Sequence, residues 1–173
     1  GRGQSSGVVW CAGPATGRYP LDVPTLLRAM KIASEKDPHL KLPIGGDGED
    51  RQKLENMAKD LGLAGKVCFA GWLDDVNSFY NAIDINLLTS ISETFPYSLT
   101  EGTRMHKATI ASKVGGVPVL IDDGVNGLIF EPGDEKQLAQ HLLALSQNRE
   151  LRETFGERIY EKASREFSID RMV

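Results

Sequence analysis

Short apolar runs alternate along the chain with longer segments in which apolar residues recur every three or four positions. The short runs are typical of buried strands, and the recurring positions are typical of helices with one buried face. Strands are expected over residues 8–12, 40–44, 67–70, 83–88, 108–112 and 127–130. Helices are expected to begin near Pro24, at Asp74, at Pro96 (to about Met105), at Val117 and beyond Pro132. Another helix is expected to follow the turn at residues 45–48 and to end at Gly62.

This order of strands and helices, joined by short loops, predicts the fold class. It is typical of a parallel sheet that is covered by helices on both faces. We therefore expect an α/β fold, with a Rossmann-like parallel sheet, over residues 8–173. Residues 1–7 show no pattern and are expected to be a linker or a cloning remnant. Pro43 weakens the prediction of the second strand, because proline has no N–H to donate and is disfavoured in a central strand.

The composition favours one soluble domain. The chain has 173 residues, of which 40% are hydrophobic and 25% are charged, with a net charge of −4. This charge argues against a nucleic-acid or anionic-membrane surface. No apolar run approaches the roughly 20 residues of a membrane helix, and no signal peptide is visible. Cys11 and Cys68 have strand-like neighbours and are expected to be buried free thiols in a reducing cytoplasm.

The loops that follow the expected strands carry the candidate chemistry. They are residues 13–17, 45–48, 71–72, 90–95 and 114–116. Because the carboxyl ends of parallel strands meet at one edge of the sheet, these loops should converge there. Four of the five contain glycine, which allows close backbone approach to a ligand, although glycine also simply ends strands.

Glu93 and Glu101 stand out in the fourth of these regions. Pro96 favours a helix start between them, so Glu93 follows the strand and Glu101 lies on the helix. Carboxylates suit sugar hydroxyls, and the N–H groups of a helix N-terminus suit a diphosphate. Together they indicate a nucleotide-sugar pocket.

Both glutamates also have a purely structural interpretation. Ser90 precedes Glu93 by three residues and Ser98 precedes Glu101 by three, so each pair matches a capping box. Glu101 lies more than one turn beyond the expected helix start, which is late for a cap partner. Other chemistries have weaker signals, because the chain lacks a phosphate loop of the G-x-x-x-x-G-K-[ST] type, a full dinucleotide fingerprint and a G-x-S-x-G elbow.

At this point the sequence resembles a known family. Residues 92–101, SETFPYSLTE, look like the E-x7-E motif of retaining glycosyltransferases of family 4 (glycosyl transferases group 1), which have the GT-B fold. The resemblance continues, in order and at usual spacing, through residues 45–50, 67–72, 114–118, 123–128 and 167–173. It covers about residues 8–173, and the chain resembles the C-terminal, donor-binding half of such an enzyme.

The resemblance implies transfer of a sugar from a nucleotide diphosphate donor to a saccharide or lipid-linked acceptor, with retention of configuration. It implies no metal and no other cofactor, and it suggests cell-surface polysaccharide biosynthesis in the cytoplasm. The expected partners are the nucleotide-sugar donor and an N-terminal acceptor-binding domain of the same enzyme. Any membrane association would be peripheral and through that other half, so this domain alone should be inactive.

The resemblance also implies roles for individual residues. Glu93 would hold the sugar hydroxyls and is the candidate catalytic residue, and Glu101 would hold the ribose. Backbone near Val67 and Cys68 would face the base, and Gly46 would allow close approach. The other implied donor-binding residues are Thr94, Phe95, Pro96, Tyr97, Ser98, Leu99, Gly115 and Gly116.

The chain departs from the family pattern at two places. Thr16 and Leu21 stand where the family commonly has a basic pair for the diphosphate, with Arg18 as a possible partial substitute. Val119 stands where the family often has glutamate. These departures leave two alternatives open: a non-catalytic nucleotide-sugar binding domain, and a phosphate-binding α/β module. His106 is expected to be a surface or neighbouring group rather than an acid–base catalyst.

Overall fold

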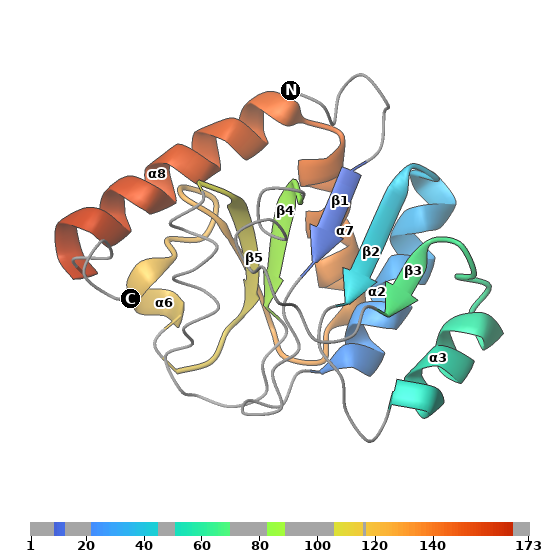
Figure 1. Cartoon of the computed structure of the whole chain (residues 1–173). Coiled ribbons are helices and arrows are strands. Elements are labelled where there is room, and N and C mark those ends of the chain that lie inside the picture. Colours follow the sequence, from blue (N-terminus) through green and yellow to red (C-terminus); the bar gives the residue numbers. More distant parts are fainter. Residues whose placement is uncertain are drawn as a thin grey trace.

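A central sheet with helices on both faces forms the body of the protein, as the computed structural model in Figure 1 shows. The structure describes residues 9–12, 22–44, 51–69, 83–88, 106–115 and 117–167. For residues 9–12, 68, 88 and 167 this description covers the backbone alone.

The sheet has six strands in the order β3-β2-β1-β4-β5-β6, and every neighbouring pair is parallel. The strands are β1 (Val9–Ala12), β2 (Leu40–Ile44), β3 (Val67–Phe69), β4 (Ile85–Leu88), β5 (Ala108–Ser112) and β6 (Leu128–Phe130). The chain builds one half outward from β1 to β3, then returns to place β4 beside β1 and builds the other half. This is the strand order of a Rossmann-like doubly wound sheet, which confirms the predicted fold class.

The described helices divide between the two faces of this sheet. They are α2 (Val23–Lys36), α3 (Arg51–Asp60), α6 (Val117–Leu120), α7 (Glu135–Ser146) and α8 (Arg149–Phe167). The larger core cluster joins α2 and α7 to strand residues such as Leu87 and Ile110. The smaller cluster joins α6 and α8 to the opposite face, at Ala111. Alternate residues of β5 thus serve different cores, as the period of a strand requires.

The sequence signals at the ends of α2 operate as expected. Pro24 lies in the first turn, where its missing N–H is no loss. The helix ends at Lys36, and the N–H of Asp37 donates to the carbonyl of Ala33. The residue before Pro38 is extended, as proline favours.

Pro43 lies in β2, which has a neighbouring strand on each side. The strand therefore forms in a central position of the sheet in spite of this proline. The N–H of Leu42 donates to the carbonyl of Lys66, on the β3 side, at 2.7 Å. The backbone N–H groups of consecutive strand residues point toward opposite neighbouring strands, so the nitrogen of Pro43 faces β1. The last registered pair between β1 and β2 is Trp10↔Lys41, upstream of Pro43, so the proline interrupts no registered pair there.

Two boundaries differ from those predicted. The fourth strand begins at Ile85 rather than Ile83, because its ladders to both neighbours start with Cys11↔Ile85 and Ile85↔Ala108. The last strand begins one residue after Gly127, which instead forms an isolated bridge with Asp123. Apolar periodicity indicates which residues are buried. The bounds of a strand depend instead on which residues pair with the neighbouring strands.

The helical region predicted beyond Pro132 consists of two helices, α7 and α8. Asn148 lies in the break and accepts the N–H of Leu151 at 3.0 Å. Arg152 donates to the carbonyls of Leu145 and Ser146, at 2.7 and 3.0 Å, and so satisfies the end of α7. Partial burial lowers the pKa of the Arg152 guanidinium.

Candidate functional site

The carboxyl ends of all six strands lie at one edge of the sheet, because every pair is parallel. Strand order reverses between β1 and β4, which are hydrogen-bonded neighbours with the register Ala12↔Asn86. In open α/β sheets the crevice outside such a reversal is the usual place for a ligand. The chain leaves this point through residues 13–21 after β1 and residues 89–105 after β4.

Most of the predicted site residues lie in segments outside the described residues. These are Arg18, Gly46, Glu93, Thr94, Phe95, Pro96, Tyr97, Ser98, Leu99, Glu101 and Gly116, as well as Thr16 and Leu21 of the missing basic pair. The structure therefore places the strands that lead into these segments. Of the predicted donor contacts, it describes Val67, the backbone of Cys68, and Gly115.

Val67 and Cys68 lie in β3, at the edge of the sheet, in register with Leu42 and Pro43 of β2. Val67 is partly buried and packs against the larger core cluster. At the carboxyl end of the strand, the guanidinium of Arg51 donates to the carbonyl of Phe69 at 2.8 Å. This bond ties the start of α3 to the end of β3.

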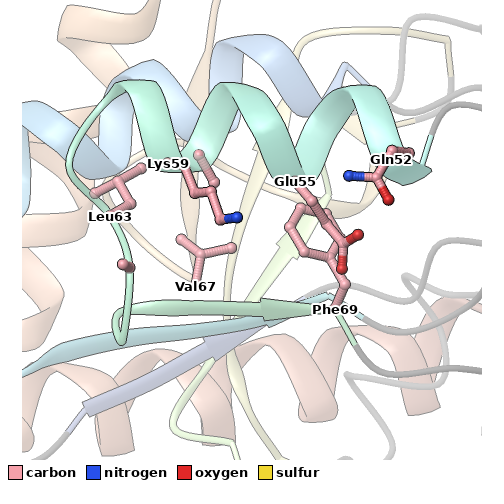
Figure 2. Close-up of a pocket in the computed structure, with 8 residues that line it drawn as sticks. Gln52, Glu55, Lys59, Leu63, Val67 and Phe69 are labelled. Carbon is pink, nitrogen blue, oxygen red and sulfur yellow. The ribbon is translucent and has the colours of Figure 1, made fainter.

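An open pocket of about 520 Å³ lies between α3 and β3 (Figure 2). Leu63, Val67 and Phe69 provide its apolar lining, and Glu55 and Lys59 extend from α3. One carboxylate and one ammonium leave these two side chains without net charge. The pocket therefore lacks the positive charge that would favour a diphosphate.

Gly115 lies in the turn that follows β5, with φ at +45°. The N–H of Val114 donates to the carbonyl of Ser112, and the N–H of Val117 donates to that of Val114. The turn therefore leads directly into α6, where Val117 is buried and Val119 is 58% exposed. A side chain at position 119 faces solvent, so the valine that stands in place of the family's glutamate is not part of the core.

The N-terminus of α2 is occupied by the chain's own carboxylate. Asp22 accepts the N–H of Thr25 at 3.2 Å and the hydroxyl of Thr25 at 2.6 Å. Pro24 has no N–H to offer. A phosphate at this helix end would have to compete with the Asp22 carboxylate, so α2 is a poor diphosphate site although it follows the first strand.

Two described features were not predicted. Asn86 is 1% exposed in β4, where its amide donates to Thr109 at 3.4 Å and its Oδ1 has no hydrogen-bond partner. His106, two residues before β5, is exposed as expected but has φ at +59°. Its Nδ1 lies 2.7 Å from Glu157 Oε2, and its ring stacks on Tyr160. Neither feature has a periodic sequence signal.

No group of three or more His, Cys, Asp or Glu side chains could hold a metal ion within the part of the chain that the structure describes. Among these same residues, no helix is both long enough and apolar enough to cross a membrane. The expectation that the site needs no metal is left untested by these observations.

Comparison with known proteins gives a consistent result. The family model for glycosyl transferases group 1 matches residues 20–162. The lipopolysaccharide core biosynthesis glycosyltransferase LpsE of Rhizobium meliloti is 29% identical over 160 residues, which cover 86% of this chain and 47% of LpsE. The chain thus spans about half the length of this relative.

Solved structures agree with the family match. The C-terminal domain of the group 1 glycosyl transferase LpcC from Francisella tularensis superposes with a TM-score of 0.80 at 25% identity, covering 95% of this chain and 90% of that one. Anabaena HepE, solved in complex with UDP-glucose, gives a TM-score of 0.82 at 24% identity, over 99% of this chain and 49% of HepE. The chain therefore belongs to glycosyl transferases group 1, and it has the fold of the C-terminal domain of their GT-B architecture.

Proposed function

We propose that this chain is the donor-binding domain of a retaining glycosyltransferase that uses a nucleotide diphosphate sugar. The observation that carries the proposal is the reversal of strand order between β1 and β4. The segment that follows β4 contains both Glu93 and Glu101. The segment that carries both candidate carboxylates therefore follows the strand end at which this class of fold usually binds a ligand.

The two helix starts favour one location for the diphosphate. The start of α2 is occupied by Asp22, which would repel a phosphate. The helix expected from Pro96 has its N-terminus between Glu93 and Glu101 in the sequence. Its free N–H groups would bind the diphosphate, with Glu93 on the sugar hydroxyls and Glu101 on the ribose. During transfer this arrangement would stabilise the departing diphosphate electrostatically.

The remaining parts of the proposal concern the whole enzyme. An N-terminal domain would bind a saccharide or lipid-linked acceptor, and LpsE, named for lipopolysaccharide core biosynthesis, supports a role in cell-surface polysaccharides. HepE was solved with UDP-glucose, which supports a nucleotide-sugar donor here. We propose a cytoplasmic enzyme that needs no metal or other cofactor, with at most peripheral membrane association through its other half.

Calorimetry tests donor binding directly. The chain is titrated with UDP-glucose, GDP-mannose and ADP-glucose, and we expect saturable binding of at least one of them. Glu101→Gln should weaken that binding about 10-fold or more, because a charge-assisted hydrogen bond to the ribose contributes roughly 1.5–3 kcal/mol. The control is Glu153→Gln on α8, which removes a carboxylate with a 63% exposed side chain from a surface ion pair and should leave the affinity unchanged.

The outcomes separate the proposal from its structural alternative. If Glu101 only caps a helix, Glu101→Gln will hardly change the donor affinity or the melting temperature, because glutamine serves equally well as the cap partner. If none of the three donors binds saturably, the chain is not a nucleotide-sugar domain. A phosphate-binding module remains in that case, and titration with inorganic phosphate would reveal it.

A second candidate function is a nucleotide-sugar binding domain without transfer activity. Thr16, Leu21 and Val119 favour it, because they stand at positions where the family commonly has charged residues. Restoring the basic pair with Thr16→Arg and Leu21→Lys distinguishes the two. In an active enzyme that manages without the pair, donor affinity should change little. A gain of about 10-fold or more would support a weakened, non-catalytic site.

A further inference from the structure

His106 is fastened to α8 by three neighbours, and we call the group of His106, Gly156, Glu157 and Tyr160 the His106 clasp. The imidazole stacks on the Tyr160 ring, with centroids 3.9 Å apart and planes inclined by 21°. On the same ring, Nδ1 lies 2.7 Å from Glu157 Oε2. One aromatic contact and one polar contact therefore fix the orientation of the imidazole.

The backbone of His106 is held as closely as its side chain. Gly156 of α8 faces the carbonyl group of His106, and a Cβ at position 156 would overlap that carbonyl oxygen and lie 2.9 Å from its carbon. The helix thus approaches the chain at His106 to a distance that only glycine permits. The contact lies two residues before Ala108, where β5 begins.

The conformation of His106 itself needs these contacts. Its φ of +59° is left-handed, and it is the one non-glycine residue with positive φ among those that the structure describes. Left-handed backbone costs free energy in a residue with a Cβ and persists where surrounding contacts determine it. The stacking, the hydrogen bond with Glu157 and the close approach of Gly156 provide that determination.

The position of His106 in the chain gives the clasp a consequence for the donor site. The sequence predicts a helix from Pro96 to about Met105, outside the described residues, and His106 follows it directly. A left-handed residue immediately after a helix is the common way in which a helix ends. Glu101 precedes His106 by five residues, little more than one helical turn.

We propose that His106 is a positioning residue for the donor site. The clasp fixes His106 against α8, at the point where the segment that carries Glu101 reaches β5, and it thereby limits where the Glu101 carboxylate can meet the donor. This inference rests on the proposed function. Without the clasp, His106 would no longer be held in one position, and the apparent donor affinity would fall with the fraction of molecules in the competent position.

The central test is His106→Gly, combined with calorimetry on UDP-glucose, GDP-mannose and ADP-glucose. Glycine adopts positive φ without strain, so the backbone turn is retained while the stacking and the hydrogen bond with Glu157 are lost. We expect the donor that binds the unaltered chain to bind about 5-fold more weakly, as if one molecule in five kept the competent position. The melting temperature should change little, because the strain is relieved as the contacts are removed.

Tyr160 provides a pair of variants that isolates the stacking. Tyr160→Phe keeps an aromatic ring against the imidazole and should bind donor as the unaltered chain does. Tyr160→Leu removes the ring and should weaken binding to the same degree as His106→Gly. A role in stability alone would make donor affinity indifferent to both changes.

Glu157 and Glu153 provide a matched pair on one helix. Their side chains are 62% and 63% exposed, and their partners are His106 at 2.7 Å and Arg149 at 3.1 Å. Glu157→Gln should weaken donor binding, whereas Glu153→Gln should not. Ser146→Ala removes the 2.8 Å hydrogen bond to Asp37 and serves as a destabilised control, whose donor affinity should be unchanged.

Hydrogen exchange of residues 96–105 completes the test. His106→Gly should accelerate amide exchange in this segment relative to the unaltered chain. Unchanged donor affinity in both His106→Gly and Tyr160→Leu would overturn the inference, and so would an equal loss in Ser146→Ala. If the unaltered chain binds none of the three donors, the proposed function has failed, and exchange alone then decides whether the clasp anchors this segment.

Discussion

Two buried asparagines in this domain differ in whether their side chains have hydrogen-bond partners. Asn86 and Asn126 are both asparagines with almost no exposed surface, at 1% and 3%. The Asn126 side chain accepts the N–H of Asp122 at 2.8 Å and donates to the carbonyl of Leu120 at 3.1 Å. Asn86 Oδ1, in contrast, is buried without a hydrogen-bond partner. The two amides are chemically equal, and their partners alone distinguish them.

We expect Asn86→Val and Asn126→Val to affect stability very differently. Burying an unpaired polar atom costs about 1–3 kcal/mol, so Asn86→Val should leave the free energy of unfolding unchanged or raise it, helped by the β-propensity of valine. Asn126→Val leaves a backbone N–H and a carbonyl unpaired and should lower the free energy of unfolding by about 2 kcal/mol or more. Urea denaturation measures both. Equal losses in the two variants would contradict this account.

At the scale of elements, one glycine allows α8 to pack closely against the chain at His106. The buried Gly156 brings the helix backbone against the carbonyl of His106, and its neighbours Phe155 and Ile159 enter the two core clusters. Glycine lowers helix propensity by about 1 kcal/mol relative to alanine, so its presence inside a 19-residue helix needs a reason. The close approach to His106 is that reason.

Gly156→Ala should therefore destabilise the domain in spite of the higher helix propensity of alanine. The added methyl group overlaps a backbone carbonyl, which cannot move like a flexible side chain, and overpacking of this kind costs about 1–3 kcal/mol. Thermal unfolding followed by circular dichroism measures the change. Glu161→Ala, at an exposed position of the same helix, is the control and should have little effect. A more stable Gly156→Ala variant would show that α8 can move away from His106.

Sequence signals at the element scale were reliable where they act locally. The proline at the start of α2, the end of that helix before Pro38 and the glycine that follows α3, Gly62, were predicted correctly, because neighbouring residues produce these features. The start of β4 was displaced by two residues, since it depends on partners in β1 and β5. The conformation of His106 was not predictable, because residues about 50 positions later hold it.

At the scale of the whole molecule, the sheet supplies a donor edge but the chain spans about half the length of its relative LpsE. A GT-B enzyme binds donor and acceptor in different halves, as the resemblance implies. We therefore expect residues 1–173 to bind a nucleotide sugar but to transfer it to no saccharide acceptor. Mass spectrometry of mixtures of the chain, the bound donor and candidate acceptors checks this. Efficient transfer by this chain alone would contradict the division of labour.

The sequence by itself determined the alternation of strands and helices, the family, and the candidate glutamates. These follow from local periodicity and from a motif of ten consecutive residues, 92–101, so neighbouring positions suffice to reveal them. Tertiary structure alone decided the strand order that places β4 beside β1 and the contact of His106 with α8. Such features depend on which distant segments pack together, and packing is a property of the folded chain rather than of any one stretch of it.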